Sequence, residues 1–177
     1  LVYPIMKKHG GGSIIHISSI EGIHPSKMMT AYNISKASLI MLGKNQAIEW
    51  GKDNIRVNMI CPGYVKTPLV LGQVADTAKA RGMSEEEVID KIILGAQATK
   101  KFVEIEEVAS LAYYLCSKEA ASITGTSMPT RCAISRTALD EATPSTVFAT
   151  VVLATSIDPL FPKTSPKVRF RESADPQ

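Results

Sequence analysis

Two short apolar runs, separated by one long helical segment, constrain the fold of this chain more than any other feature. Residues 13–17 read Ser-Ile-Ile-His-Ile, and residues 55–60 read Ile-Arg-Val-Asn-Met-Ile. Both runs are rich in β-branched residues, which favours buried strands. Residues 31–51 lie between them and carry apolar side chains over a wide arc, as expected of a helix covered on more than one side. The order strand, helix, strand predicts a βαβ unit with parallel strands and a right-handed crossover.

Polar and turn-forming residues follow the two predicted strands. Ser19 comes shortly after the first strand, and Pro62-Gly63 comes after the second. Because parallel strands end at the same edge of a sheet, we expect these residues to meet in one crevice, where open α/β sheets bind ligands. Tyr32 and Lys36 begin the helix four positions apart, so they share one of its faces.

This set of residues suits proton transfer. A lysine ammonium beside a phenol favours the phenolate and lowers the phenol pKa from its usual value of about 10. A tyrosine in that setting exchanges protons near neutral pH. The hydroxyl of Ser19 can hold a substrate oxygen beside Tyr32. Each element alone is common, since a serine after a strand is often only a turn residue; their joint spacing carries the prediction.

The remaining segments predict further helices and strands. Residues 2–9 form the end of a helix, and Gly10–Gly12 form a turn, because they follow a helix and precede a strand. The capping box Ser84-x-x-Glu87 predicts a helix through about residue 98. A second helix is predicted over residues 104–117 and a short strand over residues 126–129. Residues 131–177 are rich in Ser, Thr and Pro and are expected to be a divergent, poorly ordered tail.

Composition narrows the class of protein. The 177 residues suit one domain, and a net charge of +3 gives no argument for nucleic-acid binding. No apolar run approaches the ~18 residues of a membrane span. Neither a disulfide framework nor a metal site is expected, because the three cysteines and three histidines lack suitable spacing. A reducing cytoplasm is the expected location.

Three motifs resemble those of the short-chain dehydrogenase/reductase family. Residues 12–19 look like the strand that ends in that family's catalytic serine, and Tyr32-Asn-Ile-Ser-Lys36 is similar to its Tyr-x-x-x-Lys motif. Residues 58–63, Asn-Met-Ile-Cys-Pro-Gly, resemble its strand-end motif. The resemblance covers roughly residues 1–130. It implies an α/β fold: a partial, Rossmann-type doubly wound parallel sheet that lacks its N-terminal βαβ half.

The resemblance also implies the roles of the site residues. Tyr32 is the general acid/base, Lys36 lowers the tyrosine pKa and binds the nicotinamide ribose, and Ser19 polarises the reacting oxygen. The nicotinamide ring is lined by four further residues, namely Pro62, Gly63, Val65 and Thr67. The cofactor is NAD or NADP. The glycine-rich half that distinguishes them is expected ahead of this sequence, so the choice is not readable from these residues.

A closer resemblance is to the bacterial D-3-hydroxybutyrate dehydrogenases within that family, through residues 67–70, 82–86, 97–103 and 120–125. It favours NAD, a small 3-hydroxy acid such as 3-hydroxybutyrate, and a homodimer or homotetramer. It also implies that Gln73 contacts the substrate carboxylate. Two positions depart from the pattern: Glu21 replaces a histidine and Met29 replaces a lysine, while Lys27 lies two residues away from Met29.

Two other functions are weighed against this one. A non-catalytic, truncated dehydrogenase-like protein would act by docking subunits through the helix that begins near Ala31. A hydrolase would pair Ser18 or Ser19 with His16 or His24, but no G-x-S-x-G elbow supports it. The resemblance also stops abruptly after Thr130, which suggests a reading-frame change or a recombined gene end.

Overall fold

The structure, a computed structural model, describes residues 2–95 and 97–130, together with the backbone of residues 152–155. Short helical turns, labelled η, separate the longer elements; η3 is π-helical and the other three are 3-10 turns. In chain order the elements are α1 (Val2–Lys8), β1 (Gly12–Ile17), η1 (Ile20–Gly22), α2 (Thr30–Trp50), η2 (Gly51–Asp53), β2 (Ile55–Cys61), α3 (Pro68–Arg81), α4 (Glu85–Glu87), η3 (Val88–Ile93), α5 (Ile105–Cys116), η4 (Lys118–Ala120), β3 (Ser127–Pro129) and β4 (Val152–Thr155).

The predicted βαβ unit is present and forms the centre of the molecule. β1 and β2 pair in parallel from Gly12 opposite Ile55 to Ile17 opposite Ile60, and β3 adds to β2, also in parallel. The sheet order is β3-β2-β1-β4. These three parallel strands are part of a Rossmann-type sheet and not the whole of one, as the sequence predicts.

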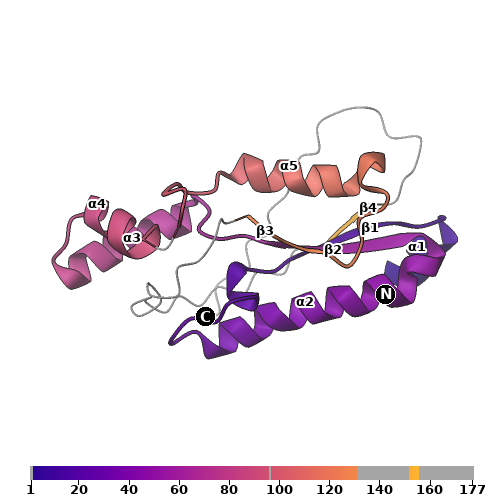
Figure 1. Ribbon diagram of the computed structural model, residues 1–177, viewed down its shortest axis with the longest axis horizontal. Helices are drawn as coiled ribbons and strands as arrows, with labels where there is room; N and C mark the ends of the chain where they lie inside the picture. Colours follow the sequence, from indigo (N-terminus) through magenta and orange to yellow (C-terminus); the bar gives the residue numbers. More distant parts are fainter. Residues whose placement is uncertain (1, 96, 131–151, 156–177) are drawn as a thin grey trace, which may run out of the picture.

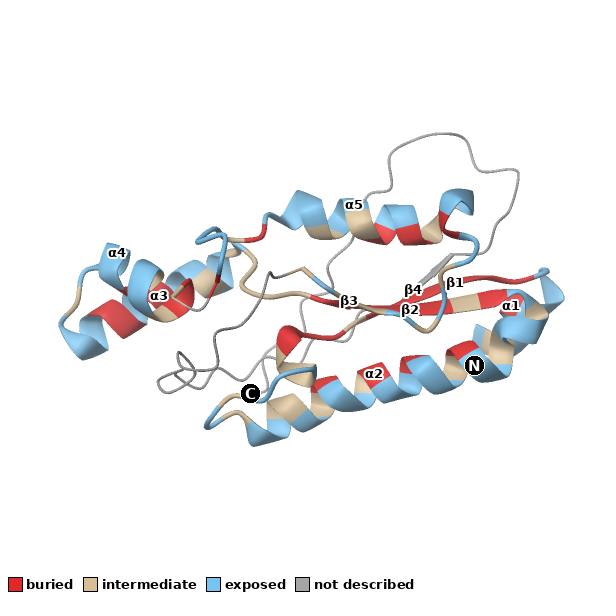
Figure 2. Ribbon diagram, in the orientation of Figure 1, coloured by how far each residue is buried: buried red, intermediate tan, exposed pale blue. Residues whose placement is uncertain are grey.

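Alternate residues of the two central strands face two different helical layers. α2 lies against one face of the sheet and α5 lies against the other (Figure 1). Ile14 and Val57 pack in the core cluster with Ala47 of α2, whereas Ile15 and Ile60 pack with Leu115 of α5. Figure 2 shows that β1 and β2 are largely buried while the outward sides of both helices are exposed. Both faces of the strands are therefore covered, which explains their nearly continuous apolar sequence.

Two contacts fix the helices on the sheet. Gly43 allows α2 to approach closely, because a Cβ atom there would overlap the Met59 sulfur. On the other face, the Arg56 guanidinium donates to the carbonyl oxygens of Leu115, at 2.7 Å, and Ser117, at 3.2 Å. These carbonyls belong to the end of α5, where a helix leaves acceptors unpaired, so Arg56 caps α5 from within β2.

The α3 lobe, defined as α3, α4 and η3, stands at one end of the sheet (Figure 1). It has a small core of its own, made of Val74, Ala78, Val88, Ile93 and Leu94. α3 begins at the cap of Thr67, whose Oγ accepts from the Val70 N–H at 3.3 Å, and ends at Gly82 with a φ of 63°. α3 was not predicted from the sequence.

The helix predicted from Ser84 through residue 98 is wrong in its extent and type. The capping box is present, with the Glu87 N–H donating to the Ser84 Oγ at 3.2 Å. The helix then widens into the π-helical η3 and stops at Ile93. The Leu94 N–H bonds back to the Ile89 carbonyl at 2.7 Å, a five-residue step that ends the regular pattern before Gly95.

β4 pairs antiparallel with the outer edge of β1, with Ile14 opposite Ala154. It was not predicted, because the sequence analysis assigned residues 131–177 to the tail. A fourth strand satisfies backbone groups that β1 would otherwise present at an open edge. The rest of the predicted tail lies outside the described residues, so its order stays a prediction.

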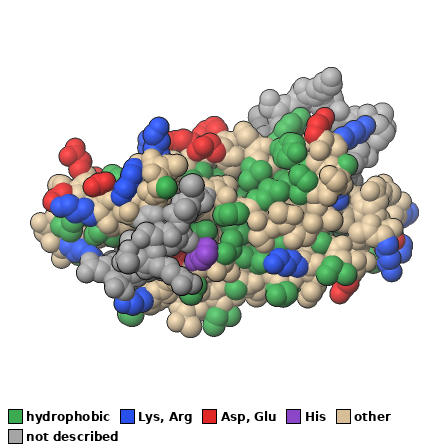
Figure 3. Space-filling view, in the orientation of Figure 1, with side chains coloured by type: hydrophobic (Ala, Val, Ile, Leu, Met, Phe, Trp, Pro, Cys, Tyr) green, Lys and Arg blue, Asp and Glu red, His purple; other side chains and the backbone are tan. Residues whose placement is uncertain are grey.

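On the face shown in Figure 3, acidic and basic side chains of the described residues are interspersed, most densely at the α3–α4 end. Within the described ranges, no helix has both the length and the apolar character needed to cross a membrane.

Candidate active site

The residues predicted to meet at the carboxyl edge of the sheet do so. Parallel pairing continues past the strand ends, because the Ser18 N–H donates to the Ile60 carbonyl at 2.8 Å and the Ile20 N–H donates to the Pro62 carbonyl at 2.9 Å. The segment that carries Ser19 and the Pro62-Gly63 turn therefore leave the sheet side by side, which is where open α/β sheets place their ligands.

Ser19 is held in a defined orientation by the turn that follows it. It caps η1 with an extended backbone, and its Oγ accepts a hydrogen bond from the Glu21 N–H at 3.1 Å. The side chain is buried. Because accepting this bond does not use the hydroxyl hydrogen, Ser19 keeps a donor for a substrate oxygen.

Tyr32 and Lys36 lie on one face of α2, as their spacing predicts. The Lys36 Nζ stands 5.6 Å from the centre of the Tyr32 ring. Lys36 is only 5% exposed, and its ammonium donates to the Ile17 carbonyl at 3.2 Å. Burial lowers the pKa of Lys36, and the electrostatic interaction with Cys61 acts in the opposite direction. This pair places a partly desolvated cation beside a phenol.

The loop after β1 is fixed directly on α2. The Ser18 Oγ donates to the Lys36 carbonyl at 2.7 Å. Gly22 also packs here: a Cβ atom at this position would lie 2.7 Å from the Lys36 carbonyl carbon and 2.8 Å from its oxygen. Since only glycine permits this approach, the position of Ser19 relative to Tyr32 depends on a backbone contact as well as on side chains.

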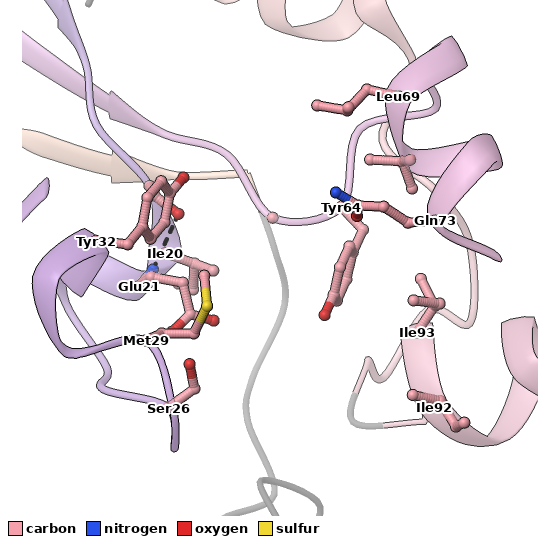
Figure 4. A pocket seen from close by; sticks show the side chains of 13 residues that line it. Ile20, Glu21, Ser26, Met29, Tyr32, Tyr64, Leu69, Gln73, Ile92 and Ile93 are labelled. Atoms are coloured by element: carbon pink, nitrogen blue, oxygen red, sulfur yellow. Dashed lines mark hydrogen bonds between the residues drawn. The ribbon is translucent and has the colours of Figure 1, made fainter. Parts of the chain in front are cut away.

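A cavity of about 180 Å³ opens between this loop and the α3 lobe. That is small beside the roughly 300–1,000 Å³ of drug-sized pockets and suits a small molecule. Figure 4 shows Tyr32, Glu21 and Met29 on one wall and Tyr64 and Gln73 on the other. The full lining is Ser19, Ile20, Glu21, Ser26, Met29, Tyr32, Gly63, Tyr64, Leu69, Val70, Gln73, Ile92 and Ile93.

Four of the eight predicted site residues line this cavity, namely Ser19, Tyr32, Gly63 and Gln73. The other four are not among its lining residues. Lys36 lies behind Tyr32, and the Pro62 carbonyl accepts from Ile20. Val65 forms a parallel bridge to Val103, and Thr67 caps α3. Pro62, Val65 and Thr67 therefore have structural roles that the sequence analysis did not assign to them.

Most of the second wall of the cavity was not predicted from the sequence. Tyr64, Leu69 and Ile92 were not proposed as site residues, yet all three line the cavity. Tyr64 had a usable signal, because it directly follows the Pro62-Gly63 turn at the sheet edge. Ile92 had none, since it reaches the cavity only through the packing of η3 on α3.

Neither histidine considered for a hydrolase is among the residues that line the cavity with Ser19. His16 Nε2 lies 2.7 Å from the Gln46 Oε1, and Ser18 donates its hydroxyl to the Lys36 carbonyl. His24 is exposed to solvent. Burial raises the pKa of the Cys61 thiol to about 11, so this cysteine stays protonated and is a poor nucleophile beside the site.

Comparison with known proteins defines the class. The family model described as enoyl-(acyl carrier protein) reductase matches residues 1–130. The chain belongs to the short-chain dehydrogenase/reductase family, as the three motifs predict.

Individual relatives support the same family. The D-beta-hydroxybutyrate dehydrogenase of Rhizobium meliloti (strain 1021) is 49% identical over 123 residues, which cover 70% of this chain and 48% of that protein. The 7alpha-hydroxysteroid dehydrogenase of Bacteroides fragilis is 39% identical, over 71% of this chain and 44% of that protein. The chain thus spans about half the length of the curated relatives it matches.

Solved structures agree with the fold. L-sorbose reductase from Gluconobacter frateurii, complexed with NADPH and L-sorbose, superimposes with a TM-score of 0.70 at 33% identity, covering 76% of this chain and 51% of that one. A 7 alpha-hydroxysteroid dehydrogenase complexed with NADH gives a TM-score of 0.61 at 30% identity, covering 75% and 48%.

Proposed function

We propose that this chain carries the catalytic and substrate-binding part of an oxidoreductase that transfers a hydride between a nicotinamide cofactor and a secondary alcohol or ketone. One observation carries the proposal. The Ser19 hydroxyl and the Tyr32 phenol line the same cavity, and the Lys36 ammonium lies 5.6 Å from the phenol ring. A hydroxyl donor and a proton-exchanging phenol side by side suit a reaction at a carbon–oxygen bond.

The chain's own residues account for the proton in this reaction. When an alcohol is oxidised, its carbon loses a hydride, its hydroxyl loses a proton, and a carbonyl bond forms. Tyr32 takes that proton as the general base, with the Lys36 ammonium beside its ring. Ser19 donates a hydrogen bond to the reacting oxygen and orients it. In the reverse direction Tyr32 returns the proton to the oxygen.

The residues present fit the nicotinamide end of a cofactor. In this proposal the buried ammonium of Lys36 would bind ribose hydroxyls, and Pro62, Gly63, Val65 and Thr67 would line the nicotinamide ring. When bound, the nicotinamide supplies or accepts the hydride. Structural neighbours hold NADPH or NADH, so both are candidates, and the resemblance to hydroxybutyrate dehydrogenase favours NAD.

The substrate is a small hydroxy or keto compound. The Rhizobium meliloti relative makes 3-hydroxybutyrate, or a related 3-hydroxy acid, the first compound to test. Gln73 lines the cavity opposite Tyr32 and offers an amide to such a substrate. We expect the enzyme to work in the reducing cytoplasm, because Cys61 and Cys116 are free thiols.

A subunit-docking role is the second candidate, and it has its own observation. Ile34, Met41 and Ile48 recur at seven-residue intervals on α2 and are 64%, 58% and 82% exposed. Apolar side chains at that spacing form a stripe on one helix face that suits a second copy of the chain. A homodimer or homotetramer that binds no nicotinamide would favour docking over catalysis. Light scattering with cofactor titration measures both properties.

The catalytic test uses a complemented enzyme. In it, the part of the Rhizobium meliloti relative that precedes the matched region is joined ahead of this full chain, and reduced nicotinamide is followed by its absorbance. Tyr32→Phe is expected to lower kcat by about 100-fold or more, the usual scale for loss of a general acid/base. Tyr113→Phe is the matched control, because Tyr113 is 68% exposed on α5. Equal activity of the two variants would remove the catalytic assignment.

A further inference from the structure

The charge of the cavity lining limits which polar groups a substrate can carry, in addition to the alcohol or ketone that reacts. The lining contains six aliphatic or thioether side chains, and among its described members Glu21 alone carries a formal charge. Lys36 directs its ammonium to the Ile17 carbonyl behind Tyr32, and Lys27 is exposed and is not among the lining residues. No basic side chain is therefore among the described residues that line the cavity with Glu21.

One side-chain oxygen of Glu21 lacks a hydrogen-bond partner among the described residues. Its backbone N–H is used by Ser19, but its Oε2 is buried and has no hydrogen-bond partner among the described residues. A buried acceptor without a donor is unfavourable, so native structures rarely leave one unless a ligand or water completes it. A hydrogen-bond donor would complete this oxygen, because a carboxylate oxygen accepts hydrogen bonds.

A second unpaired atom lies on the same wall. Ser26 lines the cavity, and its Oγ is likewise buried without a partner among the described residues. Figure 4 shows Ser26, Met29 and Glu21 on the wall that carries Tyr32. A substrate held by Ser19 and Tyr32 at one end can thus present a second polar group to Glu21 and Ser26.

We propose that the cavity selects secondary alcohols or ketones whose second polar group is a non-anionic hydrogen-bond donor, accepted by Glu21. Such groups are hydroxyls, amides and ammonium ions. A free carboxylate is disfavoured, because it has no hydrogen to donate and its charge repels that of Glu21. Gln73 on the opposite wall does not distinguish a donor group from a carboxylate, since its amide both donates and accepts hydrogen bonds. This inference rests on the proposed oxidoreductase function and specifies its substrate class.

The test compares three compounds of one carbon skeleton in the complemented enzyme. They are 3-hydroxybutyrate, its primary amide, and the diol in which a hydroxymethyl group replaces the carboxylate. The wild-type enzyme is expected to oxidise the amide and the diol with kcat/KM at least ~10-fold above that of the acid. Glu21→Gln removes the charge at constant shape and is expected to reduce this preference by ~10-fold. Glu106→Gln, an exposed change on α5, should leave it unchanged.

The outcomes separate the two proposals. If none of the three compounds is turned over with either nicotinamide, the oxidoreductase function fails. Saturation-transfer NMR on the full chain then decides the substrate class, with the diol expected to bind more tightly than the acid. If the acid is preferred in turnover or in binding, or if Glu21→Gln folds and leaves the preference unchanged, the role of Glu21 is overturned.

Discussion

The two walls of the cavity are built in different ways. The catalytic wall, which carries Ser19 and Tyr32, is an extension of the sheet and is fixed by backbone hydrogen bonds to β2 and by the Ser18 contact to α2. The α3 lobe supplies the opposite wall from a small core of its own. The segment that follows the lobe returns to the strand-end segment, where the Val103 N–H donates to the Tyr64 carbonyl at 2.9 Å.

This difference suggests that the two walls have different tasks: one wall holds the reacting groups, and the other selects the substrate. Reacting groups must hold their geometry closely, and the sheet edge with α2 provides a rigid base for them. The α3 lobe presents mostly side chains such as Leu69, Gln73 and Ile92, which shape the space that a substrate fills. Changes in the catalytic wall should therefore lower kcat, whereas changes in the α3 lobe should act mainly on KM.

The largest effect is expected for Lys36→Met, which removes the ammonium beside Tyr32. In the complemented enzyme kcat should fall by ~100-fold or more, because Tyr32 loses the cation beside its ring. At neutral pH the free energy of unfolding of the Lys36→Met variant should equal or exceed that of the wild type, because burial disfavours the charged lysine. The folded pKa lies below the unfolded value of 10.5, so the wild type should gain stability relative to the variant as pH rises between them. Kinetics and urea unfolding across pH check this, and unchanged kcat would contradict it.

Gly22→Ala tests whether backbone contact positions the catalytic wall. The added methyl group would press on the Lys36 carbonyl, so the free energy of unfolding should fall by about 1–3 kcal/mol and kcat should fall with it. Gly72→Ala is the matched control: it lies within α3 with open space around it and should stabilise by about 0.5–1 kcal/mol. Urea unfolding and steady-state kinetics measure both, and equal behaviour of the two variants would argue against the contact.

Val74→Ala tests the independence of the α3 lobe. Val74 is 1% exposed in the lobe core, and its truncation should cost on the order of 1–2 kcal/mol. Because the lobe supplies one wall of the cavity, KM should rise several-fold while kcat changes little. A comparable fall in kcat would show that the two walls act as one unit.

Gln73→Ala should have the smallest effect. It removes one amide from the lobe side of the cavity, so KM should rise by about 5- to 10-fold, the scale of one hydrogen bond, with kcat unchanged. Lys79→Ala is the matched control, because Lys79 lies on the exposed side of the same helix, α3. An unchanged KM would place Gln73 outside the substrate contacts.

Local patterns in the sequence predicted the parallel strands of the sheet and four of the residues that line the cavity. β-branched runs around a long helix predicted the parallel pair β1 and β2, because period and length are local properties. The spacing of Tyr32 and Lys36 placed both on one helix face for the same reason. α3 could also have been predicted, since Thr67 and Pro68 begin it and Gly82 ends it.

Tertiary structure decided the rest, because those features depend on residues far apart in the chain. Ile92 reaches the cavity only when η3 packs on α3, and β4 joins the sheet only by pairing with β1. The unpaired Glu21 oxygen is likewise invisible in the sequence, since burial without a partner exists only after the loop, α2 and the α3 lobe have come together. The sequence by itself determined which polar residues meet at the edge of the sheet, because strand order is a local property; packing decided which side chains line the cavity.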